Sequence, residues 1–111
     1  MRPEEKKLLK DIEVSVLNIN VHLEGRRIWE EFEGNITKRR AVERELEIIG
    51  EATNNLLKIN PALPVSSARQ IVNLRNRVIH AYDTVHEIIL WNVVINDLPV
   101  LLTEVQQLLA E

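Results

Sequence analysis

The length of 111 residues accommodates one domain, and 45% hydrophobic with 28% charged residues is the balance of a folded globular protein rather than a disordered chain. The chain has no cysteine, which excludes disulfides, thiolate metal sites and a cysteine nucleophile. The net charge is −3, but residues 35–83 carry eight basic against five acidic side chains. A locally basic middle on an acidic protein favours selective contact with RNA over tight binding to polyanions in general.

The sequence gives no sign of a membrane segment. The first residues are charged and amphipathic, without the apolar core of a signal peptide, and no run of about 18 apolar residues is apparent. Together with the absence of cysteine, this predicts a cytoplasmic protein that makes no membrane contact.

The hydrophobic pattern is helical along almost the whole chain. Apolar residues at three- and four-residue spacing predict a first helix from about Pro3, a favourable first helical residue, to about Gly25. A shorter helical piece is expected from Arg26 to Glu33, ending at a Gly-Asn pair. The third helix begins at a cap formed by Asn35 or Thr37.

The clearest break is the Asn-Pro-Ala-Leu-Pro stretch at 60–64, where two prolines remove backbone donors and disfavour helix. Ser66 or Ser67 then caps a fourth helix that ends near Tyr82. Residues 84–87, Thr-Val-His-Glu, predict a capping box at the start of the last helix.

The last helix runs to the C-terminus, with a kink or restart at Pro99. Four long helices with short connections predict an all-α, up-and-down four-helix bundle with one extra short helix, forming a single domain over residues 1–111.

The end of the fourth helix gathers four polar side chains. At about 100° per residue, Arg75, Asn76, His80 and Tyr82 fall within a sector of roughly 160°. One helix would therefore present a permanent cation, an amide, an imidazole and a phenol together. Spacing alone does not separate a catalytic set from a chance one, and a tyrosine near a helix end, such as Tyr82, is more often a core or joint residue that hydrogen-bonds through its hydroxyl.

These groups are sufficient for RNA cleavage without a metal. His80 can take a proton from a ribose 2′-hydroxyl or return one to the leaving 5′-oxygen. Arg75 can donate to the scissile phosphate, and Asn76 can hold the phosphate or fix the imidazole tautomer. With one such histidine per chain, a symmetric dimer that places two of these helices face to face would supply acid and base from different subunits.

Two blocks of the sequence resemble the HepT-like branch of the HEPN superfamily (higher eukaryotes and prokaryotes nucleotide-binding). The first is Ala-Val-Glu-Arg-Glu-Leu-Glu-Ile-Ile-Gly-Glu-Ala at 41–52, and the second is Leu-Arg-Asn-Arg-Val-Ile-His-Ala-Tyr at 74–82, the R-x-x-x-x-H-x-Y signature. Supporting matches are Pro61, Pro64, Trp91 and the Asn-Asp-Leu-Pro stretch at 96–99. The resemblance covers about two thirds of the chain in the family's order.

The resemblance implies a homodimeric, HEPN-like endoribonuclease whose cleft lies between two signature helices. Arg75 and His80 would be the catalytic pair, Asn76 a supporting polar residue, and Glu51 a weaker candidate for the cleft wall. For Glu51 a solvated or ion-paired helix residue is an equal alternative. The resemblance implies neither a metal nor a cofactor.

The resemblance also implies a role as the toxin of a type VII-like HEPN/MNT toxin–antitoxin system. The partner would be a minimal nucleotidyltransferase (MNT) antitoxin that transfers AMP to Tyr82. A bulky anionic nucleotide beside Arg75 would then occupy the site and repel RNA phosphate. Transfer RNA is favoured over messenger RNA as the substrate.

The chain departs from the family pattern at two positions. Val65 stands where many relatives have tryptophan, and His86 where they often have aspartate. His86 is either a second titrating group near the cleft or a surface residue at a helix start. His22 matches nothing in the family, and a solvent-facing or packed histidine is expected there. The three histidines lack metal-ligand spacing, so we expect no metal site.

A second function of another class stays open at the sequence level, a noncatalytic helical module that binds a nucleotide or a partner protein. The intact set of Arg75, His80 and Tyr82 favours the enzyme over this module. A purely structural bundle would leave the cluster unexplained.

Overall fold

The computed structural model describes residues 1–66, 70–73 and 84–111, with the backbone alone at 84–86. All regular elements in these ranges are helical, namely α1 (Pro3–His22), α2 (Trp29–Glu33), α3 (Ile36–Ile59), α5 (Thr84–Asn92), the π-helical η1 (Val93–Asp97) and α6 (Leu98–Ala110). Residues 70–73 are helical as well. The all-α prediction is confirmed. Most of the expected fourth helix lies outside the described residues.

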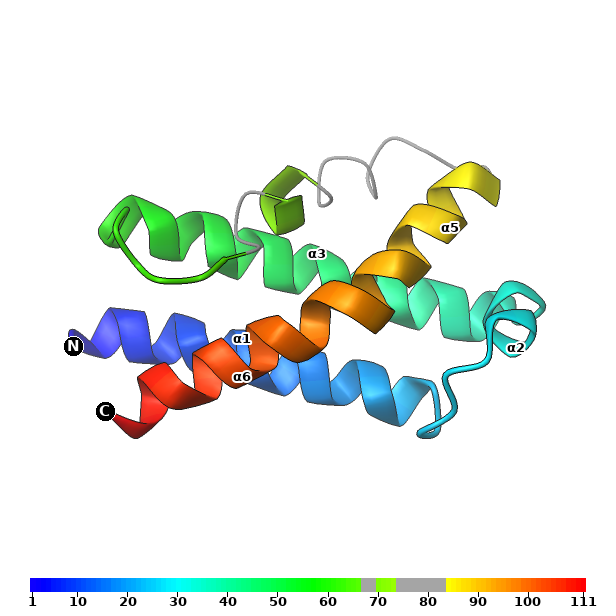
Figure 1. The fold of residues 1–111 in the computed structure, drawn as a ribbon, viewed down its shortest axis with the longest axis horizontal. Helices are drawn as coiled ribbons and strands as arrows, with labels where there is room; N and C mark the ends of the chain where they lie inside the picture. Colours follow the sequence, from blue (N-terminus) through cyan, green and yellow to red (C-terminus); the bar gives the residue numbers. More distant parts are fainter. Residues whose placement is uncertain (67–69, 74–83) are drawn as a thin grey trace.

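The described helices pack together as a bundle (Figure 1). Helix α3 lies against α1 and runs in the opposite direction, and α6 packs against α1 on its way back. The short α2 packs against α3. Both ends of the chain therefore lie at the same end of the bundle (Figure 1).

Helix α1 begins where the sequence predicts it. Pro3 occupies its first turn, where a missing N–H costs nothing, and two glutamates there face the positive end of the helix dipole. The helix ends at His22, somewhat before the expected Gly25. The reason is the backbone, because Glu24 (φ 58°) and Gly25 (φ 70°) both take left-handed conformations that a helix cannot continue through.

The predicted start of the short second helix at Arg26 was wrong. Helix α2 begins at Trp29, because Ile28 takes an extended conformation (φ −116°, ψ 114°). The Nε of Arg26 instead lies 2.9 Å from both carboxylate oxygens of Glu31, so this side chain bridges the connection before α2.

Asn35, rather than Thr37, caps α3. Its side-chain oxygen accepts a hydrogen bond of 3.0 Å from the backbone N–H of Lys38. The helix then continues for 24 residues and ends at Ile59, directly before the predicted break. There the side chain of Asn60 accepts from the N–H of Ala62, which closes the first turn of the loop.

The irregularity expected at Pro99 lies earlier in the chain. Residues Val93–Asp97 form a π-helical turn between α5 and α6, and Pro99 sits in the first turn of α6. The hydroxyl of Thr103 donates to the Pro99 carbonyl at 3.1 Å. The predicted capping box involves side chains at 84–86, which lie outside the description.

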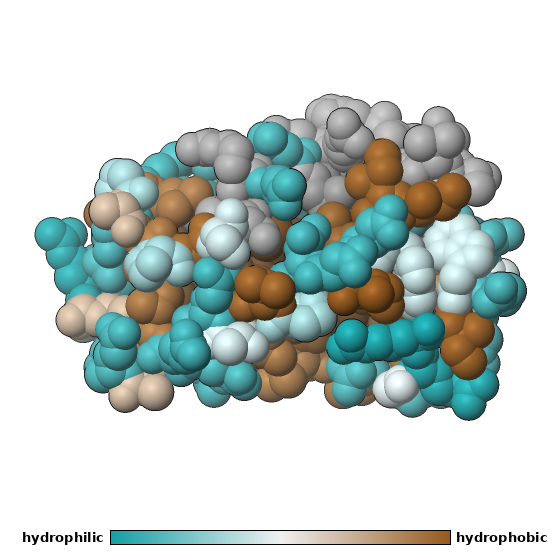
Figure 2. All heavy atoms as spheres, in the orientation of Figure 1, coloured by the Kyte–Doolittle hydropathy of each residue, from teal (hydrophilic) through white to brown (hydrophobic). Residues whose placement is uncertain are grey.

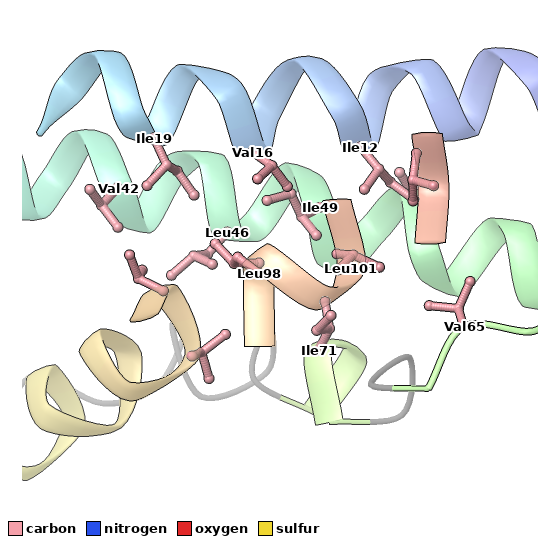
Figure 3. Packing of buried hydrophobic residues seen from close by; sticks show 14 of the residues in the cluster. Ile12, Val16, Ile19, Val42, Leu46, Ile49, Val65, Ile71, Leu98 and Leu101 are labelled. Atoms are coloured by element: carbon pink, nitrogen blue, oxygen red, sulfur yellow. The ribbon is translucent and has the colours of Figure 1, made fainter. Parts of the chain in front are cut away.

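The hydrophobic core lies where α1, α3 and α6 meet (Figure 3). Figure 3 shows side chains from the three helices converging with two residues from the segment after α3. The labelled set comprises Ile12, Val16, Ile19, Val42, Leu46, Ile49, Val65, Ile71, Leu98 and Leu101. Val65, one of the two positions where the chain departs from the pattern it resembles, is thus a buried core residue.

The expectation that no segment could span a membrane needs correction. By length and composition alone, Glu87–Ala110 is long and apolar enough to cross a bilayer, and 33% of its most apolar window is buried inside the protein. A single such helix is a weak signal, because core helices of globular proteins have the same composition. On the face that α5 and α6 cross, hydrophobic patches alternate with hydrophilic ones (Figure 2).

Candidate active site

The four signature residues Arg75, Asn76, His80 and Tyr82 lie outside the described residues. His86 falls in α5, and its side chain is also outside the description. The structure therefore defines the site through the elements that precede and follow the signature in the chain. Each of these flanks is held by specific contacts.

The flank before the signature is tied to α6. The backbone N–H and the hydroxyl of Ser66 both donate to the carboxylate of Glu104, with shortest distances of 3.1 Å in each case. Leu63 and Val65 are buried just before this point, and Ile71 is 1% exposed just after the next gap. The hydrogen bonds from Ser66 to Glu104 and the burial of Leu63 and Val65 together hold the end of the loop that follows α3.

The flank after the signature is held by an ion pair. The Nε of Arg39 lies 3.0 Å from a carboxylate oxygen of Glu87, and the two side chains are 21% and 20% exposed. A terminal nitrogen of the same guanidinium donates to the backbone carbonyl of Glu33, at the end of α2. Arg39 therefore links the ends of three helices, α2, α3 and α5.

Glu51, the weaker candidate for the cleft wall, is exposed on α3. It lines a shallow hollow of about 240 Å³ between α1 and α3, together with Lys7 and Asp11. The Nζ of Lys7 is 2.8 Å from Asp11, so the lysine that lines this hollow has an acidic partner on its own helix. The position of Glu51 relative to Arg75 and His80 falls outside the described residues.

His22 is a packed histidine rather than a free one. Its Nε2 lies 2.8 Å from a carboxylate oxygen of Glu45, and this contact joins the end of α1 to the middle of α3. Glu45 itself is buried. Within the described ranges, no three histidine, aspartate or glutamate side chains gather in a way that could hold a metal ion.

A larger groove lies on another side of the bundle. It has a volume of about 370 Å³ and runs between α1 and the η1–α6 segment, lined by Leu17, Leu23, Arg27, Leu98 and Pro99 among others. Its walls are mostly apolar, and none of the predicted site residues contributes to it. It offers no acid–base pair for catalysis.

Comparison with known proteins decides the family. The model of the family described as ribonuclease HepT-like matches residues 12–108. The chain belongs to this family. The matched region includes both sequence blocks and the whole signature from Arg75 to Tyr82. No solved structure gives a significant match.

Individual relatives agree with the HepT-like assignment. A protein named "Putative RNase" from Methanocaldococcus jannaschii is 39% identical over 82 residues, covering 70% of this chain and 72% of the relative. A second protein of that kind from the same organism is 33% identical over 85 residues, covering 75% and 69%. A "Probable ribonuclease HepT" from Thermococcus cleftensis is 40% identical over 63 residues, covering 53% and 54%.

Membership in the HepT-like family supports endoribonuclease activity for this chain. The signature could be recognised from the sequence because its residues lie close together in the chain. The flanking contacts of this HepT-like protein were not recognisable in the same way. Arg39 and Glu87 are separated by 48 positions, and Ser66 and Glu104 by 38, so no local pattern pairs them.

Proposed function

We propose that this chain is a metal-independent endoribonuclease, acting as the toxin of a type VII-like HEPN/MNT toxin–antitoxin pair. The observation that carries the proposal is the HepT-like family match across residues 12–108, which contains the intact Arg75, His80 and Tyr82. The substrate is RNA, with transfer RNA favoured.

In the proposed reaction His80 accepts the proton of a ribose 2′-hydroxyl as the oxygen attacks the adjacent phosphorus. The bond from phosphorus to the 5′-oxygen breaks, and the 5′-oxygen takes a proton from a second imidazole. Arg75 donates to the phosphate oxygens as their negative charge increases, and Asn76 holds the phosphate or the imidazole. A homodimer supplies the second imidazole, because each chain has one signature histidine.

The activity test uses purified protein and total RNA, with and without EDTA. Arg75→Ala and His80→Ala each reduce cleavage by about 100-fold or more, the usual magnitude for losing a general acid–base or a charge-stabilising group. Arg77→Ala is the matched control, because it removes the same kind of cation two positions away, about 200° around the helix that the sequence predicts, and should retain activity. EDTA leaves the parental rate unchanged.

Three outcomes would contradict the proposal. Cleavage by both Arg75→Ala and His80→Ala at the parental rate would reject the active-site assignment. Loss of activity in EDTA would reject metal independence. RNA or nucleotide binding without any cleavage by the parent protein would favour the noncatalytic module instead. Mapping the cut ends identifies the RNA class.

The proposed dimer is tested by its mass in solution. Sedimentation equilibrium should give twice the chain mass of 12.9 kDa, and Arg75→Ala and His80→Ala should leave that mass unchanged. A parent protein that cleaves RNA as a monomer would rule out the supply of acid and base from two subunits.

Regulation is proposed to act on Tyr82. An MNT-type nucleotidyltransferase would transfer AMP from ATP to the phenol oxygen, with loss of pyrophosphate, and the added phosphate would repel RNA near Arg75. After co-expression with such a partner, mass spectrometry should find one or more AMP units on Tyr82 and a loss of cleavage. Label that persists in Tyr82→Phe would refute this role.

A further inference from the structure

Arg39 contacts the first turn of α5. Its guanidinium contacts two elements besides its own, the carbonyl of Glu33 at the end of α2 and the carboxylate of Glu87 in the first turn of α5. Since one side of the planar group is held by a backbone carbonyl, its other side presents a fixed donor to Glu87. Both side chains are about four-fifths buried, so the pair is less screened than an ordinary surface ion pair.

The base of this contact is rigid. Arg39 lies in the first turn of α3, whose backbone begins at the Asn35 cap, and its own N–H donates to the Asn35 carbonyl at 3.0 Å. Three residues further along, Val42 is fully buried in the core. The guanidinium therefore extends from a part of the chain that packing holds in place.

The far end of α5 is anchored differently. Leu90 is fully buried, and the Trp91 ring packs 4.9 Å from that of Phe32 and 6.1 Å from that of Trp29. Ile88, between these anchors and the start of the helix, is 46% exposed. The ion pair with Arg39 joins Glu87 of α5 to α3. The apolar anchors fix one end of α5, and this ion pair fixes the other.

The position of that end matters because of what precedes it in the sequence. Glu87 is one helical turn from Thr84, where α5 begins, and Tyr82 and His80 come two and four residues before Thr84. Because the signature is covalently joined to Thr84, we expect a displacement of the helix start to displace His80 and Tyr82 as well. Misplacement of a catalytic group by about 1 Å can lower a rate by about 100-fold.

We propose that Arg39 and Glu87 are positioning residues for RNA cleavage, a clamp that fixes the start of α5 and through it the register of the signature. The inference rests on the proposed ribonuclease function. The clamp touches no substrate and acts through His80 and Tyr82.

The experiment is a double-mutant cycle with Arg39→Ala, Glu87→Gln and the double variant, measured for kcat, KM and thermal unfolding. Each single variant should lower kcat by between about 10-fold and 100-fold, with KM within about twofold of the parent, since orientation rather than binding is lost. The double variant should be no worse than either single variant, because the two residues act as one unit. Glu87→Gln keeps the side-chain shape, so the test survives if Arg39→Ala folds poorly.

The matched control is the pair Arg44 and Glu47, 3.3 Å apart on α3, which links no second element. Its variants Arg44→Ala and Glu47→Gln should retain the parental kcat. Amide hydrogen exchange gives a readout independent of catalysis, and the amides of residues 84–88 should exchange faster in Arg39→Ala and in Glu87→Gln than in the control variants.

Parental kcat in both clamp variants, additive effects in the double variant, or unchanged exchange at 84–88 would each overturn the clamp. A parent protein without RNA cleavage, or equal activity in Arg75→Ala, would instead reject the proposed function. The proposed effect of the Arg39–Glu87 pair on kcat would then be rejected together with the ribonuclease function. The hydrogen-exchange data would still show whether this pair holds the start of α5.

Discussion

Arg26 and Glu31 show how a single side-chain pair closes a connection between helices. The hydrogen bond from Arg26 and the attraction of its charge hold the pKa of the Glu31 carboxyl below its ordinary value. The same contact raises the pKa of Arg26. The pair is exposed to solvent, so its contribution is local to the connection before α2.

The sign of the resulting pH dependence follows from the direction of the Glu31 shift. A carboxyl whose pKa is lowered by folding stabilises the folded state above its unfolded pKa, and this contribution disappears as the pH falls through the lowered value. Arg26→Ala should therefore raise the pKa of Glu31, measured by NMR titration of its side-chain carboxyl. Arg27→Ala, which removes the adjacent cation, should leave it in place. Equal shifts in the two variants would show that general charge, rather than the hydrogen bond, sets the pKa.

At the scale of helices, boundaries set by local chemistry were predictable and those set by backbone conformation were not. Pro3 and the break at 60–64 act within a few residues, and the start of α1 and the end of α3 follow them. The late start of α2 was missed because it depends on an extended Ile28, which composition does not reveal. The π turn of η1 was missed for a similar reason, since the change to i→i+5 hydrogen bonds leaves no sequence pattern.

The candidate site divides in the same way. The signature from Arg75 to Tyr82 is recognisable because its members lie within eight positions of one another in the sequence, at a spacing that predicts one helix face. The pair of Arg39 and Glu87, the tie of Ser66 to Glu104 and the packing of His22 on Glu45 join residues far apart in the chain. Such contacts depend on the relative placement of helices, which a single sequence does not encode locally.

The Asn35 cap gives a prediction for α3 as a unit. Replacing Asn35 by alanine removes the acceptor for the Lys38 N–H and should lower the free energy of unfolding by about 1 kcal/mol. Asn55→Ala, at an exposed position in the same helix, should cause no loss, because alanine is the better helix former there. Urea denaturation of both variants compares them. Equal losses would mean that the side-chain cap contributes nothing specific.

For the molecule as a whole, stability comes from one core shared by the long helices. Leu9 of α1, Ile49 of α3 and Leu101 of α6 are all fully buried in a single cluster. The apolar character of the last helix is consistent with this core role, although several of its residues remain exposed. Unfolding should therefore be cooperative across the described helices.

Leu101→Ala tests this cooperativity. The lost side chain leaves a cavity at the junction of three helices, and the free energy of unfolding should fall by about 2 to 5 kcal/mol. Val100→Ala, at a 48% exposed position on the same helix, should change it by no more than about 0.5 kcal/mol. Circular dichroism during urea unfolding gives both values. Similar losses for the two variants would show that α6 is not part of a shared core.

The ring cluster of Trp29, Phe32 and Trp91 has a spectroscopic consequence. Both tryptophans of the chain lie in it, with ring centroids 6.1 Å apart, so the tryptophan fluorescence of the protein arises from one place, the contact between α2 and α5. Emission will therefore follow the separation of these two helices, even when the helical content elsewhere is unchanged. Tryptophan emission therefore reports whether α5 is packed against α2.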